Sequence, residues 1–102
     1  NPAELLMKAN LETLLAEVSG RYDYVILDAP PIMAVTDAAI LGQQAGTTII
    51  VARYGLTTEQ DIENCIVRFA NSNVVVKGAI LNGVEKSANN YYAYEAYNSY
   101  YK

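Results

Sequence analysis

Histidine is absent from this 102-residue sequence, and cysteine occurs only once, as Cys65. The lack of histidine excludes a Ser-His-Asp triad and any metal site built on imidazole. One cysteine cannot form a disulfide within the chain, so the sequence favours a reducing compartment. We predict that Cys65 packs in the core, because Ile62 and Phe69 share its helical face and a free cysteine behaves as a small hydrophobe.

Basic residues are also scarce. Seven Lys and Arg residues against eleven Asp and Glu residues give a net charge of −4, which excludes non-specific nucleic-acid binding. No apolar run approaches the ~20 residues that span a bilayer, and no signal-peptide pattern opens the chain. The composition, 52% apolar and 18% charged, is typical of a globular domain or of part of one.

A phosphate-binding P-loop is missing as well. Gly78 and Gly83 have the glycine spacing of Gly-x-x-x-x-Gly-Lys-Ser/Thr, but Val84 and Glu85 follow where lysine and a hydroxyl residue are required. The chain therefore has no phosphate cradle, and we expect it to bind Mg·ATP weakly or not at all by itself.

The segments that are present alternate between helix and strand patterns. Such alternation predicts an α/β fold with a parallel sheet joined by βαβ crossovers. Helices are expected at about 3–18 (or two shorter helices broken near residue 9), at 38–44, and from Thr57 or Thr58 to about 71–73. Strands are expected at about 23–28, 47–52 and 76–82.

The first predicted strand ends in a carboxylate. The apolar run from Tyr24 to Leu27 leads directly into Asp28, and two prolines at 30 and 31 stop the strand. Ile26 should then be buried, as should Ile50 and Ile80 in the other strands. Asp28 would lie at the carboxyl end of the sheet, where it could bind Mg²⁺ or simply begin a turn.

Other polar residues lie at element ends. Thr36 is predicted to cap the helix at 38–44, and Asp37 fits its first turn better than it fits a second site carboxylate. Arg53 follows the second strand and could reach a phosphate or a partner chain, or remain solvated. Thr57 or Thr58 is expected to cap the next helix, with an amide or acid at the matching offset.

Residues 87–102 differ in character from the rest of the chain. They contain six of the nine tyrosines and no aliphatic residue larger than alanine, which predicts disorder. Composition alone leaves three readings open: an aromatic helix stripe, an assembly-prone segment, or a set of phosphorylation sites.

Several sequence blocks together resemble one family, the bacterial tyrosine autokinases of capsule and exopolysaccharide export. The blocks are Asn1-Pro2-x-Glu4-Leu5-Leu6, residues 22–32 around Asp28, residues 34–38, Val51-Ala52-Arg53-Tyr54 and residues 77–82. The resemblance extends from Asn1 into the tyrosine-rich tail.

The resemblance implies a three-layer P-loop NTPase-like fold related to the partitioning ATPases, of which this chain would be the carboxyl-terminal half. It implies ATP and Mg²⁺ as cofactors of the intact kinase, with Asp28 at the Walker B position as catalytic and metal-organising residue. It implies that Asn82 reads the adenine edge. The phospho-acceptors would be Tyr91, Tyr92, Tyr94, Tyr97, Tyr100 and Tyr101.

The expected organisation is a kinase segment at 1–86 and a phospho-acceptor tail at 87–102. The expected partners are the missing amino-terminal half, neighbouring subunits of a homo-oligomeric ring and a tyrosine phosphatase, but not nucleic acid. The parent would be anchored in the bacterial inner membrane with this part on the cytoplasmic side. Two alternatives are half of a partitioning-type ATPase and a non-enzymatic module that bears phosphotyrosines.

Overall fold

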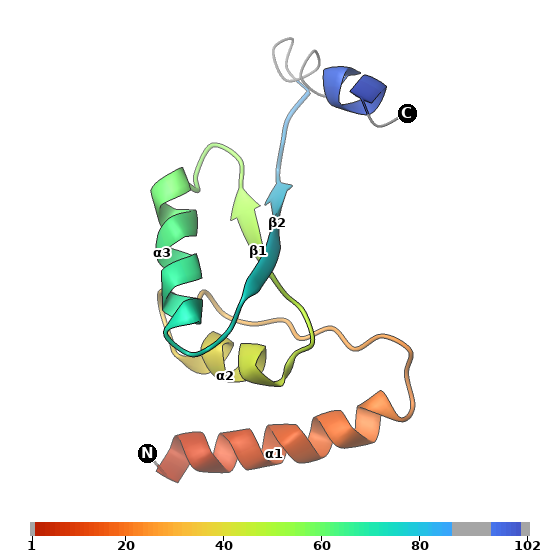
Figure 1. The fold of residues 1–102 in the computed structure, drawn as a ribbon, viewed down its shortest axis with the longest axis vertical. Helices are drawn as coiled ribbons and strands as arrows, with labels where there is room; N and C mark the ends of the chain where they lie inside the picture. The colour runs from red at the N-terminus through yellow and green to blue at the C-terminus, as the bar shows by residue number, and fades with distance from the viewer. Residues whose placement is uncertain (1, 87–94, 101–102) are drawn as a thin grey trace.

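Two parallel strands with helices beside and below them form the part of the chain that the structure describes, residues 2–86 and 95–100 (Figure 1). The structure is a computed structural model. The elements in chain order are α1 (Pro2–Ser19), α2 (Asp37–Gln44), β1 (Thr48–Arg53), α3 (Glu59–Ala70) and β2 (Val76–Asn82). The predicted α/β class is confirmed.

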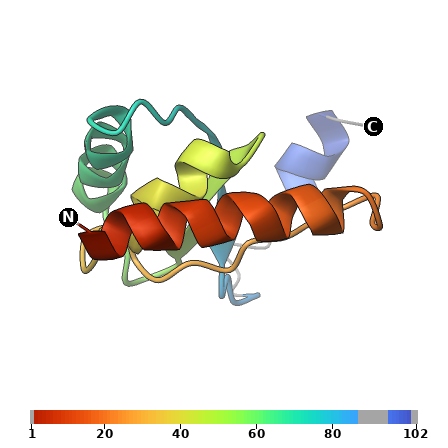
Figure 2. The same ribbon diagram turned by 90° about the horizontal axis from the view of Figure 1, so that it is seen from below.

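The amino-terminal segment forms one helix, α1, which decides between the two predicted alternatives. Pro2 occupies its first turn, where a missing backbone N–H costs nothing. None of its residues is buried, although Leu5, Leu6 and Leu14 are large and apolar. α1 lies next to α2 along the lower side of the molecule (Figure 2), where the Gln44 side-chain amide donates to the Glu12 carboxylate at 3.3 Å.

Helix α2 begins at Asp37, one residue before the predicted start, and Asp37 lies in its first turn as predicted. Thr36 is the residue before the helix, but its hydroxyl makes no capping hydrogen bond. Its backbone is already helical, with φ −80° and ψ −9°. A capping side chain needs an extended backbone to reach back to the first free N–H groups, so the expected side-chain cap at Thr36 is wrong.

Helix α3 has the predicted capping box at its amino end, with Thr58 as the cap and Asp61 as the partner. At its carboxyl end Asn73 adopts the left-handed conformation (φ 59°), which asparagine tolerates better than most residues. This turn allows the Val74 N–H to donate to the Phe69 carbonyl at 3.0 Å. Val74 is thereby returned to the core beside Phe69.

The sheet is formed by β1 and β2, which pair in parallel as predicted. In register, Ile50 faces Ala79, Ala52 faces Leu81 and Arg53 faces Asn82. α3 packs beside both strands, and Ala52 is only 2% exposed. The core cluster consists of Ile32, Ala38, Ala39, Phe69 and Val74, with Ile50, Cys65 and Val76 packed against it.

The expected strand at 23–28 is wrong. Residues 24–30 lie in irregular structure, and the exposed fractions of Tyr24 and Ile26 are 89% and 91%. Figure 1 shows this segment crossing below the strands instead of running along them. A buried strand needs a neighbouring ladder for its N–H and C=O groups, and the described residues offer none alongside this segment.

Burial is one-sided in β1, whereas β2 is exposed on both faces after Val76. The β1 residues alternate between exposed and more buried positions, so Ile49 and Val51 lie on one face with Ile80, the register partner of Val51. Ile80 is 53% exposed and Ile50 is half-buried, so full burial of Ile80 was a wrong expectation. Within the described residues, no element covers this face, which we call the open face.

The inner face of α3 is narrow. Phe69 is buried and Ile62 and Cys65 are half-buried, but Ile66 and Ala70 are exposed. The Cα radius of gyration is 16.9 Å, against about 13 Å expected for a compact domain of this length. The elements present are too few to surround α3 on more than one side.

Six residues of the tail, 95–100, are helical. For these six the prediction of disorder is wrong, and the helical alternative applies. The other tail positions lie outside the described residues, and the boundary expected at 86/87 stays a prediction.

Candidate functional site

The carboxyl ends of β1 and β2 form the part of the structure that best fits a ligand site of an α/β sheet. In such folds ligands bind in the crevice beyond the carboxyl ends of the strands. Arg53 and Asn82 are the final residues of the two strands and are partners in register. The structure therefore places an arginine and an asparagine next to each other at this edge.

The backbone at this edge is fixed by hydrogen bonds. The Arg53 N–H donates to the Thr57 hydroxyl at 2.8 Å, and the Thr57 N–H donates back to the Arg53 carbonyl at 2.9 Å. The Tyr54 N–H donates to the Asn82 carbonyl at 2.8 Å, which continues the ladder beyond β1. Gly55 provides the positive φ (77°) that the turn requires.

Sequence reasoning treated Thr57 and Thr58 as alternative helix caps, but the structure uses both. Thr57 closes the turn after β1, while the Thr58 hydroxyl accepts from the Asp61 N–H at 3.0 Å and its N–H donates to the Asp61 carboxylate at 2.9 Å. These bonds from the Thr58 backbone and side chain lower the pKa of Asp61. A threonine four residues after a strand end, with an intervening glycine, was the available signal for the Thr57 turn.

Asp28 lies in the exposed segment that precedes α2, not at the end of a strand. Within residues 2–86 and 95–100, no group of three acidic or cysteine side chains could bind a metal ion. The segment that contains Asp28 crosses below the strands, whereas β2 ends at Asn82 on the opposite side (Figure 1). The structure therefore does not bring the two predicted nucleotide residues together. An exposed carboxylate still fits Mg²⁺, which commonly binds one or two protein carboxylates and takes its other ligands from phosphates and water.

Two predicted phospho-acceptors fall within the described residues. Tyr97 and Tyr100 are 61% and 83% exposed, and their spacing places them on the same side of the helix at 95–100. Tyr91, Tyr92, Tyr94 and Tyr101 lie outside the described residues.

Cys65 is half-buried and packs against the core cluster, as predicted. Burial raises the pKa of its thiol, the Asp61 carboxylate raises this pKa further, and the Arg68 guanidinium opposes both effects. A raised pKa keeps the thiol protonated at neutral pH, so the chemistry of Cys65 is that of a packing residue.

An open groove of about 560 Å³ lies between α1, α2 and α3. Its lining includes Ile32, Gln43 and Arg68, together with Glu4 and Lys8 of α1. Neither Asp28 nor Asn82 lines it, so it is separate from the predicted nucleotide residues.

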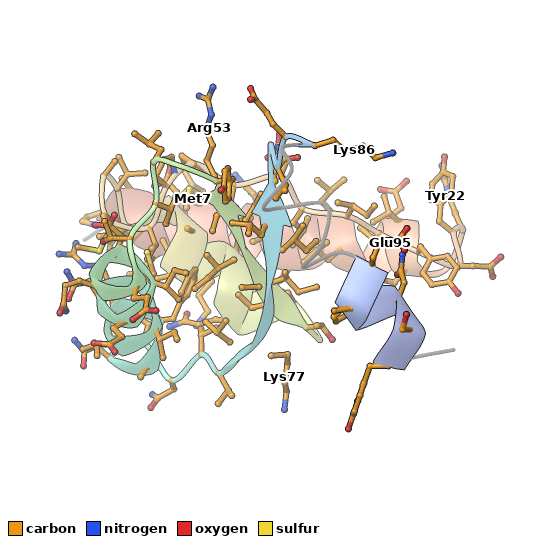
Figure 3. All side chains as sticks on the ribbon, turned by 90° about the horizontal axis from the view of Figure 1, so that it is seen from above. Met7, Tyr22, Arg53, Lys77, Lys86 and Glu95 are labelled. Carbon is orange, nitrogen blue, oxygen red and sulfur yellow. The ribbon has the colours of Figure 1, made fainter. Side chains whose placement is uncertain are left out.

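Side chains at the strand ends differ in direction (Figure 3). Arg53 and Lys86 project from the same edge of the molecule in this view, whereas Lys77, near the start of β2, projects from the opposite edge. Two cations thus lie on one side of the sheet and one lies on the other.

This arrangement of parallel strands and helices matches solved kinase domains with a P-loop NTPase-like fold. The kinase domain of Escherichia coli tyrosine kinase ETK superposes with a TM-score of 0.78 and 46% sequence identity, over 86% of this chain and 34% of that chain. The BceF tyrosine kinase domain superposes with a TM-score of 0.69 and 46% identity, over 83% of this chain and 35% of that chain.

Curated relatives identify the group more closely. The tyrosine-protein kinase wzc of Salmonella typhimurium is 47% identical over all 102 residues. A putative tyrosine-protein kinase in the cps region of Klebsiella pneumoniae is 54% identical over 92 residues, and the tyrosine-protein kinase etk of Escherichia coli K12 is 46% identical over 94. A scan against protein-family models found no match.

The chain is therefore homologous, along its whole length, to a segment of the bacterial Wzc and Etk tyrosine-protein kinases. It spans 14% of the length of the Salmonella wzc kinase and about a third of the solved kinase domains. No helix within 2–86 or 95–100 combines the length and apolar character needed to cross a membrane.

Proposed function

We propose that this chain is part of the catalytic domain of a protein-tyrosine kinase, which transfers the γ-phosphate of ATP to tyrosine hydroxyls. The observation that supports this most strongly is 46–54% identity to tyrosine-protein kinases over nearly the entire chain. In the reaction the phenolic oxygen forms a bond to the γ-phosphorus, the bond to the β-phosphate oxygen breaks and ADP leaves. The phenolic proton passes to a base that we expect outside this chain.

The remainder of the kinase domain would supply what this segment lacks. The solved kinase domains are about three times as long as the matched region, and the open face with Ile49, Val51 and Ile80 is apolar surface that a further layer can cover. Such a layer would also complete the expected three-layer fold, in which helices cover both faces of the sheet. A further strand beside the sheet would offer residues 24–28 a ladder partner and so bring Asp28 to the sheet edge near Asn82.

In the assembled site, Asp28 would bind and orient a Mg²⁺ ion and Asn82 would contact the adenine edge. When bound, the Mg²⁺ neutralises charge that builds up on the transferring phosphate. The chain contributes the exposed carboxylate of Asp28 and the carboxamide of Asn82, and it lacks a phosphate cradle of its own.

The tail would present the acceptor hydroxyls. Tyr97 and Tyr100 are exposed on one side of a short helix, a geometry in which a neighbouring subunit of a ring could reach both phenols. Each phosphate adds about −1.5 to −2 charges, so full modification of six tyrosines would add roughly −9 to −12. Repulsion between the negatively charged tails of neighbouring subunits would loosen the ring. A tyrosine phosphatase would remove the phosphates and allow the ring to form again. The parent would act in capsule or exopolysaccharide export, at the cytoplasmic side of the inner membrane.

The test compares Asp28→Asn with Asp23→Asn in the full-length protein. Asp23 is an exposed carboxylate five positions away in the same segment and is the matched control. After incubation with Mg·ATP, mass spectrometry should find tail phosphorylation at least about tenfold slower in Asp28→Asn and unchanged in Asp23→Asn. Equal rates in both variants would mean that Asp28 is only a turn residue.

The same experiment separates the two alternatives. A partitioning-type ATPase would release phosphate from ATP while leaving the tail tyrosines unmodified. A non-enzymatic module would show no phosphotyrosine with Mg·ATP alone and would become modified only after a second kinase is added.

A further inference from the structure

Arg53 ends β1 at the carboxyl edge of the sheet, and hydrogen bonds fix its backbone there. The proposed kinase chemistry assigns no role to its positive charge. Arg53 is the register partner of Asn82, and partners in a parallel pair direct their side chains to the same face. Adjacent strands lie about 4.8 Å apart, so a ligand touching the Asn82 amide is within reach of the Arg53 guanidinium.

The Arg53 backbone is held on both sides. Its N–H donates to the Thr57 hydroxyl at 2.8 Å and its carbonyl accepts from the Thr57 N–H at 2.9 Å. At Gly83 the chain turns with φ +75°, and a Cβ built there would lie 3.9 Å from the Arg53 Cγ. The Arg53 stem therefore lies directly beside the turn that follows Asn82.

Arg53 forms no ion pair within residues 2–86 and 95–100. Its side chain is exposed, and the ion pair that does form in the described part of the chain joins Arg21 and Glu17 at 3.1 Å. Figure 3 shows Lys86 projecting from the same edge as Arg53. Glu85 precedes Lys86 in the chain, so Arg53 gives this edge an excess of positive charge, which favours an anionic ligand there.

We propose that Arg53 binds a phosphate group of the nucleotide whose adenine edge is read by Asn82. This inference rests on the proposed kinase function and deepens it by naming a further binding residue. A planar guanidinium presents five N–H donors in a fork that fits two phosphate oxygens, and it stays charged at all relevant pH values. The neutral Asn82 amide can hydrogen-bond to the adenine, and the Arg53 guanidinium can bind the negatively charged phosphates.

The experiment measures binding of ATP, ADP and adenosine to the full-length protein by calorimetry. The variants are Arg53→Gln, Arg53→Lys and the control Lys77→Gln, which removes an exposed cation from the opposite edge. Arg53→Gln should weaken ATP and ADP binding by about tenfold, as expected for a lost charge-assisted hydrogen bond, and leave adenosine binding unchanged. The ATP and ADP affinities of Arg53→Lys should lie between those of wild type and Arg53→Gln, because lysine keeps the charge but lacks the two-pronged donor geometry of the guanidinium.

Salt provides a second measurement. The difference in ATP affinity between wild type and Arg53→Gln should shrink as ionic strength rises, whereas Lys77→Gln should match wild type throughout. An equal loss for adenosine would overturn the phosphate assignment, as would unchanged ATP affinity in Arg53→Gln. If the wild-type protein binds no ATP, the proposed kinase function fails together with this inference. If it binds ATP and Arg53→Gln is silent, only the role of Arg53 fails.

Discussion

Gly42 lies where helix α2 crosses the end of α3, and its replacement by alanine tests how tightly the two helices pack. A Cβ at this position would lie 3.0 Å and 3.3 Å from the two methyl carbons of Val74 and 3.5 Å from Cε1 of Phe69. Neither neighbour can turn towards solvent easily, because Val74 is 5% exposed and Phe69 is 7% exposed.

Two opposing effects determine the result of Gly42→Ala. Alanine is favoured over glycine inside a helix by about 0.8–1.0 kcal/mol. Overpacking of a filled core costs about 1–3 kcal/mol. We therefore expect a net loss of about 1 kcal/mol in the free energy of unfolding.

A double-mutant cycle with Val74→Ala separates the two effects. Without the valine methyl groups the crowding disappears, so Gly42→Ala in that background should stabilise the protein by about 0.5–1 kcal/mol. The coupling between the two positions should then be about 2 kcal/mol. Urea unfolding with an unchanged m-value is the assay.

Gly46→Ala is the control, because nothing lies within 4 Å of a Cβ at Gly46. Its effect should stay within about 0.5 kcal/mol, as for most surface changes. If Gly42→Ala stabilises the wild-type background by the full helix-propensity gain, α2 and α3 do not pack as closely as described and the reasoning fails.

The helix cap and the thiol of α3 give the remaining predictions. Thr58→Ala should destabilise the protein by about 1 kcal/mol in urea unfolding, whereas Thr58→Ser should retain the cap. Because the pKa of Asp61 is lowered from 3.8 in the folded state, its stabilisation is present above pH 3.8 and is lost as pH falls through the lower folded value. Thr58→Ala should reduce that acid-dependent loss without removing it, because the Thr58 backbone N–H, the larger cause of the lowered pKa, still donates to Asp61. Asp61→Asn should remove the loss, and an unchanged pH profile in that variant would argue against the capping box. Cys65 should react with iodoacetamide more slowly than a free cysteine at pH 8, because its pKa is raised. Asp61→Asn should speed this reaction and Arg68→Gln should slow it, and the opposite order would contradict the assigned charges.

The sequence alone predicted those helices and strands whose ends are set by interactions between residues close together in the chain. The helix at Glu59–Ala70 follows from a threonine cap and an acid three residues later, both of which act within one turn. The strand at Val76–Asn82 was predicted with its bounds, because the apolar run is delimited in the sequence by the asparagines at 71 and 73 and by Gly83. The family resemblance could also be recognised from the sequence, because it depends on residue identity and not on tertiary contacts.

Tertiary structure decided the state of residues 24–28 and the burial of the sheet. The apolar run at Val25–Leu27 has the composition of a buried strand, but a strand exists only where another strand accepts its hydrogen bonds. Ile26 and Ile80 also have the apolar character of buried strand residues, yet both are exposed because no element of the described chain covers them. The position of Asp28 depends on that missing pairing, whereas the adjacency of Arg53 and Asn82 follows from a register that composition does not specify.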